Sequence, residues 1–193
     1  MLMGLVAAIA VAVALRRRGS LAALAAIRLR GAWMLPVALG LQVLVVTVAP
    51  GLPHAITSTV HLLSYALAGA FLALNLRLRG MPVVALGAGA NAITIALNGG
   101  VLPASAAALA AAGWRTDGSD FANSAPLASP RLAFLGDNYV SPEWLPLRNV
   151  FSIGDVVIAL GLVVLVLAAT RHKPRHRVAE SGLLRTRHLS PQT

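Results

Sequence analysis

Long apolar stretches dominate this chain and constrain its fold more than any other feature. They cover residues 1–15, 32–49, 55–76, 81–97 and 153–170. A transmembrane helix needs about 20 predominantly apolar residues, within a range of roughly 17 to 25. The first stretch is short, but the side chain of Arg16 can extend from its end to the membrane surface. The sequence therefore predicts a bundle of five transmembrane helices.

The composition supports a membrane protein and excludes the main alternatives. Of 193 residues, 58% are hydrophobic and 11% are charged, whereas soluble domains carry roughly a quarter charged residues. So many apolar side chains cannot be buried inside a globule of this size. The chain has no cysteine, which excludes disulfides, thiolate metal sites and cysteine nucleophiles. We predict an all-α integral membrane protein with one domain over residues 1–170 and a basic tail over 171–193 that we expect to be disordered.

Basic residues are distributed unevenly between the apolar stretches, and this predicts the orientation. Five arginines lie between residues 16 and 31, two between 77 and 79, and six basic residues lie in the tail. The connection 50–54 has none, and the long loop 98–152 has three. Cytoplasmic loops are enriched in Lys and Arg. We therefore expect an outside N-terminus, a cytoplasmic C-terminus and a partly ordered extracytoplasmic loop over 98–152.

Two other readings of the charges are weaker. A secretory signal peptide carries its basic residues before the apolar run, whereas here residues 16–18 follow it, which favours a retained anchor. A net charge of +10 can indicate nucleic-acid binding. The basic residues border apolar stretches without interleaved aromatic residues, so we expect no nucleic acid. The expected partners are membrane lipids, with anionic headgroups at the cytoplasmic face, and, as an open alternative, another membrane protein.

Short helices are predicted by capping residues outside the apolar stretches. Ser20 can cap an interfacial helix over 21–30, and Ser105 can cap an Ala-rich helix over 106–112 that Gly113 would terminate. The Pro- and Ser-rich linker 115–130 is the segment that we expect to be most mobile. The residues after it are apolar and aromatic, so we expect them to fold back onto the bundle.

Three phrases of the sequence carry a family resemblance. They are residues 97–105 (LNGGVLPAS), 132–137 (LAFLGD) and 149–155 (NVFSIGD), which follow the arginine-rich first connection in order. In these features the chain resembles the DUF5317 family of small multi-pass bacterial membrane proteins, to which no function is assigned. The resemblance implies a membrane location and does not imply a reaction.

Polar residues inside the apolar stretches form two stripes at helical spacing. His61 and Ser64 lie on one face of the third stretch, and Asn91 and Thr94 lie on one face of the fourth. Polar groups in transmembrane helices usually face other helices or a cavity. We expect the two stripes to face each other, either as interhelical contacts or as the lining of a ligand site.

The candidate external site combines the polar residues at the outer ends of the helices. Its members are Asn98, Asp137, Asn149 and Asp155. Asp155 lies three residues after Ser152, the spacing of a capping box, which gives it a structural role. Alternatively, Asp137 and Asp155 form a pair of carboxylates that could perform acid–base chemistry or hold a cation.

The motifs of known chemistry are missing from the sequence. We find no Gly-x-Ser-x-Gly, no phosphate-binding loop and no His-Glu-x-x-His. His54 and His61 lack the further ligands that zinc requires, so we assign no metal, no cofactor and no catalytic residue.

The sequence therefore favours a non-enzymatic binding or interaction component with an extracytoplasmic polar site. One alternative is a membrane-embedded enzyme that acts on a lipid or cell-envelope precursor through the outer carboxylates. A small transporter is less favoured, because the fifth stretch has no polar residue between Asp155 and Thr170 and no inverted repeat is visible.

Overall fold

The computed structural model describes residues 2–17, 19–48, 51–114, 124–145 and 148–171. Its α-helices are α1 (Leu2–Arg16), α2 (Leu21–Ala25), α3 (Met34–Val43), α4 (His54–Leu74), α5 (Met81–Leu97), α6 (Ala106–Ala112) and α7 (Ile153–Arg171). A π-helical turn, Leu44–Val48, continues α3. Each of the five apolar stretches thus contains a helix, and the bounds of α5 and the start of α7 agree with the predicted ranges. The predicted tail lies outside the described residues, as does part of the linker, 115–123.

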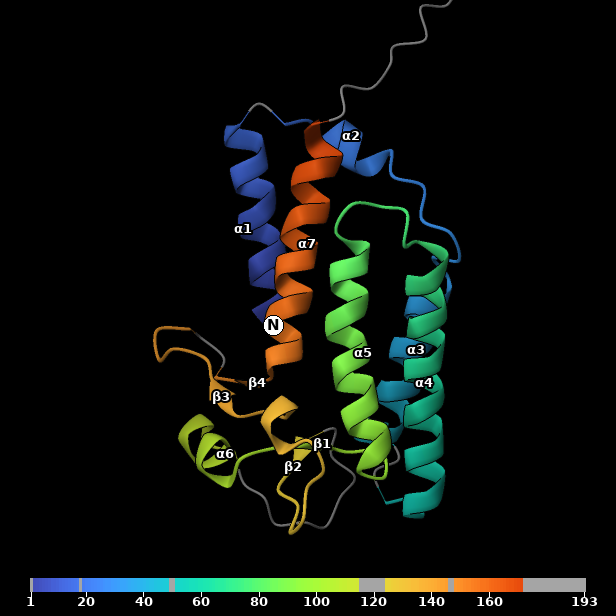
Figure 1. Ribbon diagram of the computed structural model, residues 1–193, viewed down its shortest axis with the longest axis vertical. Helices are drawn as coiled ribbons and strands as arrows, with labels where there is room; N and C mark the ends of the chain where they lie inside the picture. Colours follow the sequence, from blue (N-terminus) through green and yellow to red (C-terminus); the bar gives the residue numbers. More distant parts are fainter. Residues whose placement is uncertain (1, 18, 49–50, 115–123, 146–147, 172–193) are drawn as a thin grey trace, which may run out of the picture.

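The helices form an elongated bundle in which the last helix lies in the middle. Figure 1 shows α1 beside α7, with α5 on the other side of α7 and α3 and α4 beyond it. Helices α1, α4 and α7 end at one end of the bundle, where α5 begins. Segment 98–152 lies at the opposite end. The bundle therefore separates two groups of connections that differ in sequence and charge.

Glycines allow α5 and α7 to approach each other closely. A Cβ atom on Gly87 would lie 2.5 Å from the carbonyl oxygen of Gly154 and 2.8 Å from the backbone nitrogen of Ile158. At a second contact, one turn earlier on α5, a Cβ atom on Gly161 of α7 would lie 2.6 Å from the backbone nitrogen of Val84. Small residues allow this kind of close backbone packing between helices in membranes. We call this contact the glycine seam.

The bundle exposes many large apolar side chains and buries several polar ones among its apolar interior residues. Leu39, Leu86 and Leu160 are 61%, 69% and 58% exposed, and many other large apolar side chains are exposed along the helices. The fully buried side chains include Thr57, His61, Ser64, Thr94 and Ser152. Two helices, α4 and α7, are long and apolar enough to cross a membrane, and α3 and α5 are shorter apolar helices.

Segment 98–152 is less helical than an all-α fold implies, and here the prediction was incomplete. It contains four strands of two residues each among the described residues: β1 (Leu102–Pro103), β2 (Ser124–Ala125), β3 (Tyr139–Val140) and β4 (Val150–Phe151). β1 and β2 pair in parallel, and β3 and β4 pair antiparallel. The predicted helix α6 is confirmed. The Ser105 side chain accepts a hydrogen bond from the backbone N–H of Ala108, and Gly113 ends the helix with a φ of +76°.

The interfacial helix α2 is shorter than predicted. Ser20 caps it as expected, through the backbone N–H of Ala23, but the helix ends at Ala25 instead of continuing to Arg30. Arg30 is instead held by Asn75, which follows α4. The Asn75 side chain accepts from the backbone N–H of Arg30 at 2.9 Å and donates to its carbonyl oxygen at 2.8 Å. These two bonds replace the helical partners that Arg30 would otherwise need.

Candidate functional site

Segment 98–152 is joined to the bundle through Asn98, the residue that follows α5. Its side-chain amide donates to the carbonyl oxygens of Thr94 at 2.7 Å and Arg131 at 2.8 Å. The backbone N–H of Arg131 donates in return to Asn98 Oδ1 at 2.8 Å. The segment thus contacts the bundle at Arg131, but Phe134, Tyr139 and Trp144 are exposed and not covered as expected. We call the described part of 98–152 the cap.

Asp137 joins two parts of the cap through its backbone. Its backbone N–H donates to the carbonyl oxygen of Pro103 at 2.8 Å, and its own carbonyl accepts from Ser105 at 3.1 Å. The side chain is only 5% exposed. Its Oδ2 accepts a hydrogen bond from the Ser124 hydroxyl, whereas Oδ1 has no hydrogen-bond partner among the described residues. The carboxyl group is thus buried with half of its acceptor capacity unused.

Burial raises the pKa of the Asp137 carboxyl from 3.8 to about 6. The hydrogen bond from Ser124 lowers the pKa and so opposes this effect, while the charge of Asp155 adds to it. Desolvation disfavours the charged form of a carboxyl group, and a nearby like charge does the same. The two predicted carboxylates therefore lie near enough to interact electrostatically.

Asp155 takes part in a closed set of hydrogen bonds at the start of α7. Its Oδ2 accepts from the backbone N–H of Ser152, and its own N–H donates to Ser152 Oγ, both at 3.0 Å. This confirms the predicted capping box. Asn91 of α5 completes the set: its amide donates to Asp155 Oδ1 at 3.1 Å, and its Oδ1 accepts from Ser152 Oγ at 3.0 Å. We call these three residues the Asn91 ring.

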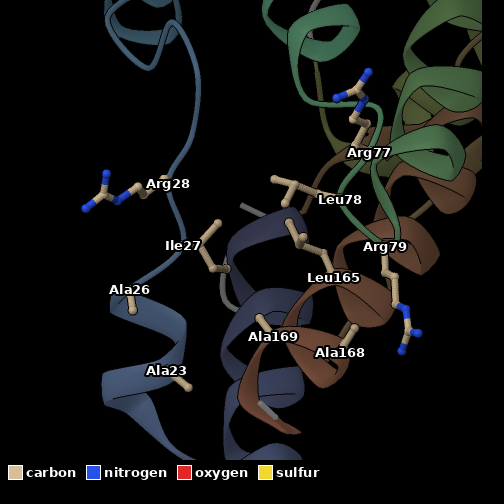
Figure 2. A pocket seen from close by; sticks show the side chains of 10 residues that line it. All are labelled: Ala23, Ala26, Ile27, Arg28, Arg77, Leu78, Arg79, Leu165, Ala168 and Ala169. Atoms are coloured by element: carbon tan, nitrogen blue, oxygen red, sulfur yellow. The ribbon is translucent and has the colours of Figure 1, made fainter. Parts of the chain in front are cut away.

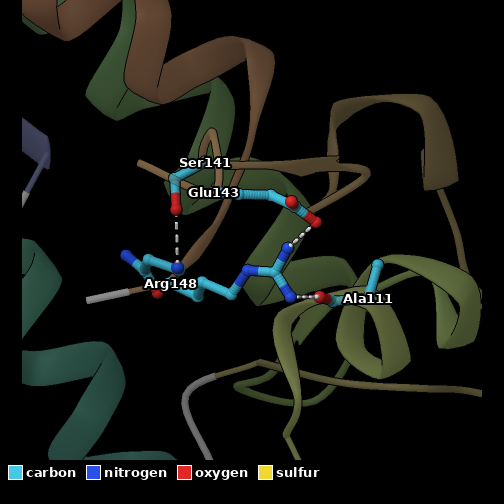
Figure 3. Close-up of polar contacts among 5 residues, drawn as sticks. Ala111, Ser141, Glu143 and Arg148 are labelled. Carbon is cyan, nitrogen blue, oxygen red and sulfur yellow. Dashed lines mark hydrogen bonds and ion pairs between the residues drawn. The ribbon is translucent and has the colours of Figure 1, made fainter. Parts of the chain in front are cut away.

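Asn149 does not join the carboxylates through its side chain. Its backbone N–H donates to Ser141 Oγ, and its carbonyl oxygen accepts from the Ser141 N–H, each at 2.8 Å. Nearby, Arg148 forms an ion pair with Glu143 and donates to the carbonyl oxygen of Ala111 in α6 at 3.0 Å (Figure 3). This part of the predicted site thus stabilises the cap.

The two polar stripes do not direct their hydrogen bonds at each other. On α4, His61 Nδ1 lies 2.8 Å from the carbonyl oxygen of Gly100, and Ser64 accepts from Gln42 of α3 at 3.1 Å. On α5, Asn91 binds residues of α7, and Thr94 donates to its own helix at Ala90. These hydrogen bonds join each stripe to other parts of the chain, and whether the two stripes also face each other stays a prediction.

Sequence reasoning missed two members of the site. Ser124 was assigned to the linker, and nothing in its local sequence marks it as a donor to Asp137. Asn91 was recognised as a buried polar residue, but its spacing could not identify Ser152 and Asp155 as its partners. The described residues contain no group of three or more His, Asp or Glu that could hold a metal ion.

Together, the fold and the site define a helical bundle with several buried polar side chains, covered at one end by a segment that contains a buried carboxyl group, Asp137. The chain belongs to the DUF5317 family, described as a family of unknown function, whose model matches residues 26–167. The family predicted from the sequence is thus confirmed. No match was found among curated proteins or among solved structures.

Proposed function

We propose that this protein crosses a bacterial cytoplasmic membrane five times, with the cap outside and the C-terminus in the cytoplasm. The observation that carries this proposal is the large number of exposed apolar side chains along the helices, together with fully buried polar groups such as His61 and Thr94. Exposed apolar area of this extent would be a liability in water. In lipid it is the favoured arrangement, since only polar groups need internal partners there.

The charges at the two ends support the orientation. The described arginines outside the cap gather where α1, α4 and α7 end and α5 begins: Arg16, Arg17, Arg28, Arg30, Arg77, Arg79 and Arg171. The described acidic residues, Asp137, Glu143 and Asp155, lie at the other end. The positive-inside rule assigns the arginine end to the cytoplasm. A C-terminal reporter should accordingly fluoresce as a GFP fusion and be inactive as an alkaline phosphatase fusion.

Within this topology, we assign the cap a non-enzymatic binding role toward a lipid, a small solute or another membrane protein. Both oxygens of Asp155 already accept hydrogen bonds that cap α7 and join it to α5. The cap also exposes aromatic side chains: Phe134 is 64% and Trp144 is 76% exposed. Aromatic residues supply much of the binding energy at interfaces and also favour the headgroup region of membranes.

One observation favours an enzyme as the second candidate. Asp137 is buried and half-unsatisfied, and its pKa is raised to about 6, in the range that general acid–base catalysis uses. Such an enzyme would act at the outer leaflet, on a lipid or envelope precursor.

Complementation of a strain that lacks the gene separates the two candidates. D137N keeps an acceptor for Ser124 but removes the titrating group, whereas a Phe134→Ala, Trp144→Ala double variant removes exposed aromatic area and leaves the carboxylates intact. A binding cap predicts that D137N complements and that the aromatic variant fails. An enzyme predicts the opposite pattern. Thermal unfolding of each purified variant identifies any loss that arises from unfolding alone.

A further inference from the structure

A pocket of about 490 Å³ lies at the arginine end of the bundle, remote from the cap. It is formed where the segment after α2, the α4–α5 connection and the last turns of α7 meet (Figure 2). Ile27, Leu78 and Leu165 supply apolar side chains from these three parts. The remaining uncharged lining consists of alanines. The floor of the pocket is therefore apolar.

Three arginines surround this apolar floor. Figure 2 shows Arg28 on one side of the pocket and Arg77 and Arg79 on the other, at its rim, with the three guanidinium groups pointing away from one another. All three are exposed, and none forms a salt bridge within the described residues. The lining contains no acidic residue. The pocket thus combines unpaired positive charge with apolar surface.

We propose that this pocket binds an anionic phospholipid of the cytoplasmic leaflet. Because these arginines are exposed, their side chains can turn from the directions seen in Figure 2 toward a bound phosphate. Arg forms paired, charge-assisted hydrogen bonds with phosphate oxygens. The glycerol and the first acyl carbons would cover Ile27, Leu78 and Leu165. Basic pockets between transmembrane helices on the cytoplasmic side suit such headgroups. This inference rests on the proposed topology, which places the arginine end at that leaflet.

The chemistry of the pocket favours a lipid over other anions. A free phosphate would satisfy the arginines but leave the apolar floor in contact with water. A nucleic acid would need stacking side chains, and the lining contains no aromatic residue. A lipid satisfies both parts of the pocket at once. It would also connect the segment after α2 to the α4–α5 connection, because Arg28 and Arg77 belong to different walls.

The test uses the purified full-length protein in detergent, with dioctanoyl phosphatidylglycerol as the probe. Binding is measured by native mass spectrometry and by the rise in melting temperature with lipid concentration. Dioctanoyl phosphatidylcholine and inorganic phosphate are measured in parallel arms. The pocket variant is R28Q/R77Q/R79Q. The matched control, R16Q/R17Q/R30Q, removes the same charge from the same end at residues that do not line the pocket. A168L fills part of the pocket without changing the charge.

The proposal predicts that phosphatidylglycerol stabilises the protein and that phosphatidylcholine and inorganic phosphate do not. The pocket variant should lose at least roughly tenfold in affinity, as expected when charge-assisted hydrogen bonds are removed. The control variant should bind like the wild type, and A168L should bind more weakly.

Equal losses in the two triple variants would overturn the proposal in favour of general charge attraction. Equal stabilisation by inorganic phosphate would assign the site to a free anion. Equal binding of phosphatidylcholine would show that the arginines do not select the ligand. These outcomes are distinct from a failure of the topology, because lipid binding in detergent does not depend on which side of a membrane the pocket faces.

Discussion

The two ends of this molecule are built on different principles. At the cap end, the side chains of Asn98 and of the Asn91 ring form hydrogen bonds within the protein. Asn98 binds the backbone of Arg131, and the Asn91 ring joins α5 to α7. At the arginine end, Arg28, Arg77 and Arg79 stand exposed around an apolar pocket, without salt bridges among the described residues. The first arrangement fixes a structure. The second leaves charge and apolar surface available to a ligand.

One device nevertheless occurs at both ends. Asn75 follows α4 and Asn98 follows α5, and each side chain pairs with both backbone groups of an arginine. Each also donates to the carbonyl oxygen four residues earlier. Asn75 is 3% exposed, whereas Asn98 is partly exposed. The same hydrogen bonds are therefore formed in a drier environment at the arginine end.

The largest loss of stability is expected from disrupting the glycine seam, the contact between the two helices α5 and α7 that connect the two ends. Gly87→Leu places a side chain against the backbone of Gly154 and Ile158, so α7 must move away from α5. We expect a cost of more than about 3 kcal/mol, at the upper end of overpacking effects. Size-exclusion chromatography should show loss of the monodisperse protein. Gly89→Leu is the matched control, because a Cβ atom there meets nothing within 4 Å; equal behaviour of the two variants would contradict the seam.

Disrupting the Asn91 ring should affect the cap end next most strongly. Asn91→Leu leaves the Ser152 hydroxyl and one oxygen of Asp155 without their partner, which costs about 2–4 kcal/mol when such groups are buried. Thr94→Val is the control, since Thr94 donates only within its own helix. The melting temperature should fall far more in N91L than in T94V. A similar decrease in both would mean that the ring adds nothing beyond ordinary helix packing.

The paired asparagines test the comparison of the two ends directly. Both Asn75→Ala and Asn98→Ala remove three hydrogen bonds, but Asn75 is more deeply buried, so we expect N75A to cost about 2–3 kcal/mol and N98A about half as much. N75A should also weaken phosphatidylglycerol binding, because Arg28 belongs to the segment that Asn75 holds. If N98A impaired lipid binding as much as N75A, the two ends would not be independent.

Unlike the variants above, a variant of Asp137 should have an effect on stability that depends on pH and disappears at low pH. Because the pKa of Asp137 is raised in the folded protein, ionisation favours unfolding, so its contribution to stability declines as the pH rises from about 4 to above 6. D137N should therefore be more stable than the wild type at pH 8, by on the order of 2 kcal/mol, and equally stable at pH 4. Melting curves across this range measure the difference. A constant difference at every pH would contradict the raised pKa.

Local features of the sequence were sufficient to predict the helices and their caps. Helix α6 begins after Ser105 and ends before Gly113, as expected. Ser152 and Asp155 form the predicted capping box. These features depend on residues three to eight positions apart, so a single sequence contains all the information they require.

Features that depend on distant residues could not be predicted. Arg30, which was predicted to end α2, is instead held by Asn75, 45 positions away. Asn91 was assigned to a polar face, but helical spacing does not say which helix covers that face. The pocket combines Ile27, Leu78 and Leu165 from three separate parts of the chain. Its apolar lining could not be predicted, because most residues of the chain are apolar and no local pattern distinguishes the ones that line the pocket.

The central claim is that a membrane separates the cap from the arginine end, and cysteine labelling in intact cells tests it most directly. The chain has no cysteine, so single substitutions at the exposed residues Ala128 in the cap and Ala22 in α2 need no altered background. A membrane-impermeant maleimide should label A128C in intact cells and A22C only after permeabilisation. Labelling of A22C in intact cells, or protection of A128C, would contradict the account.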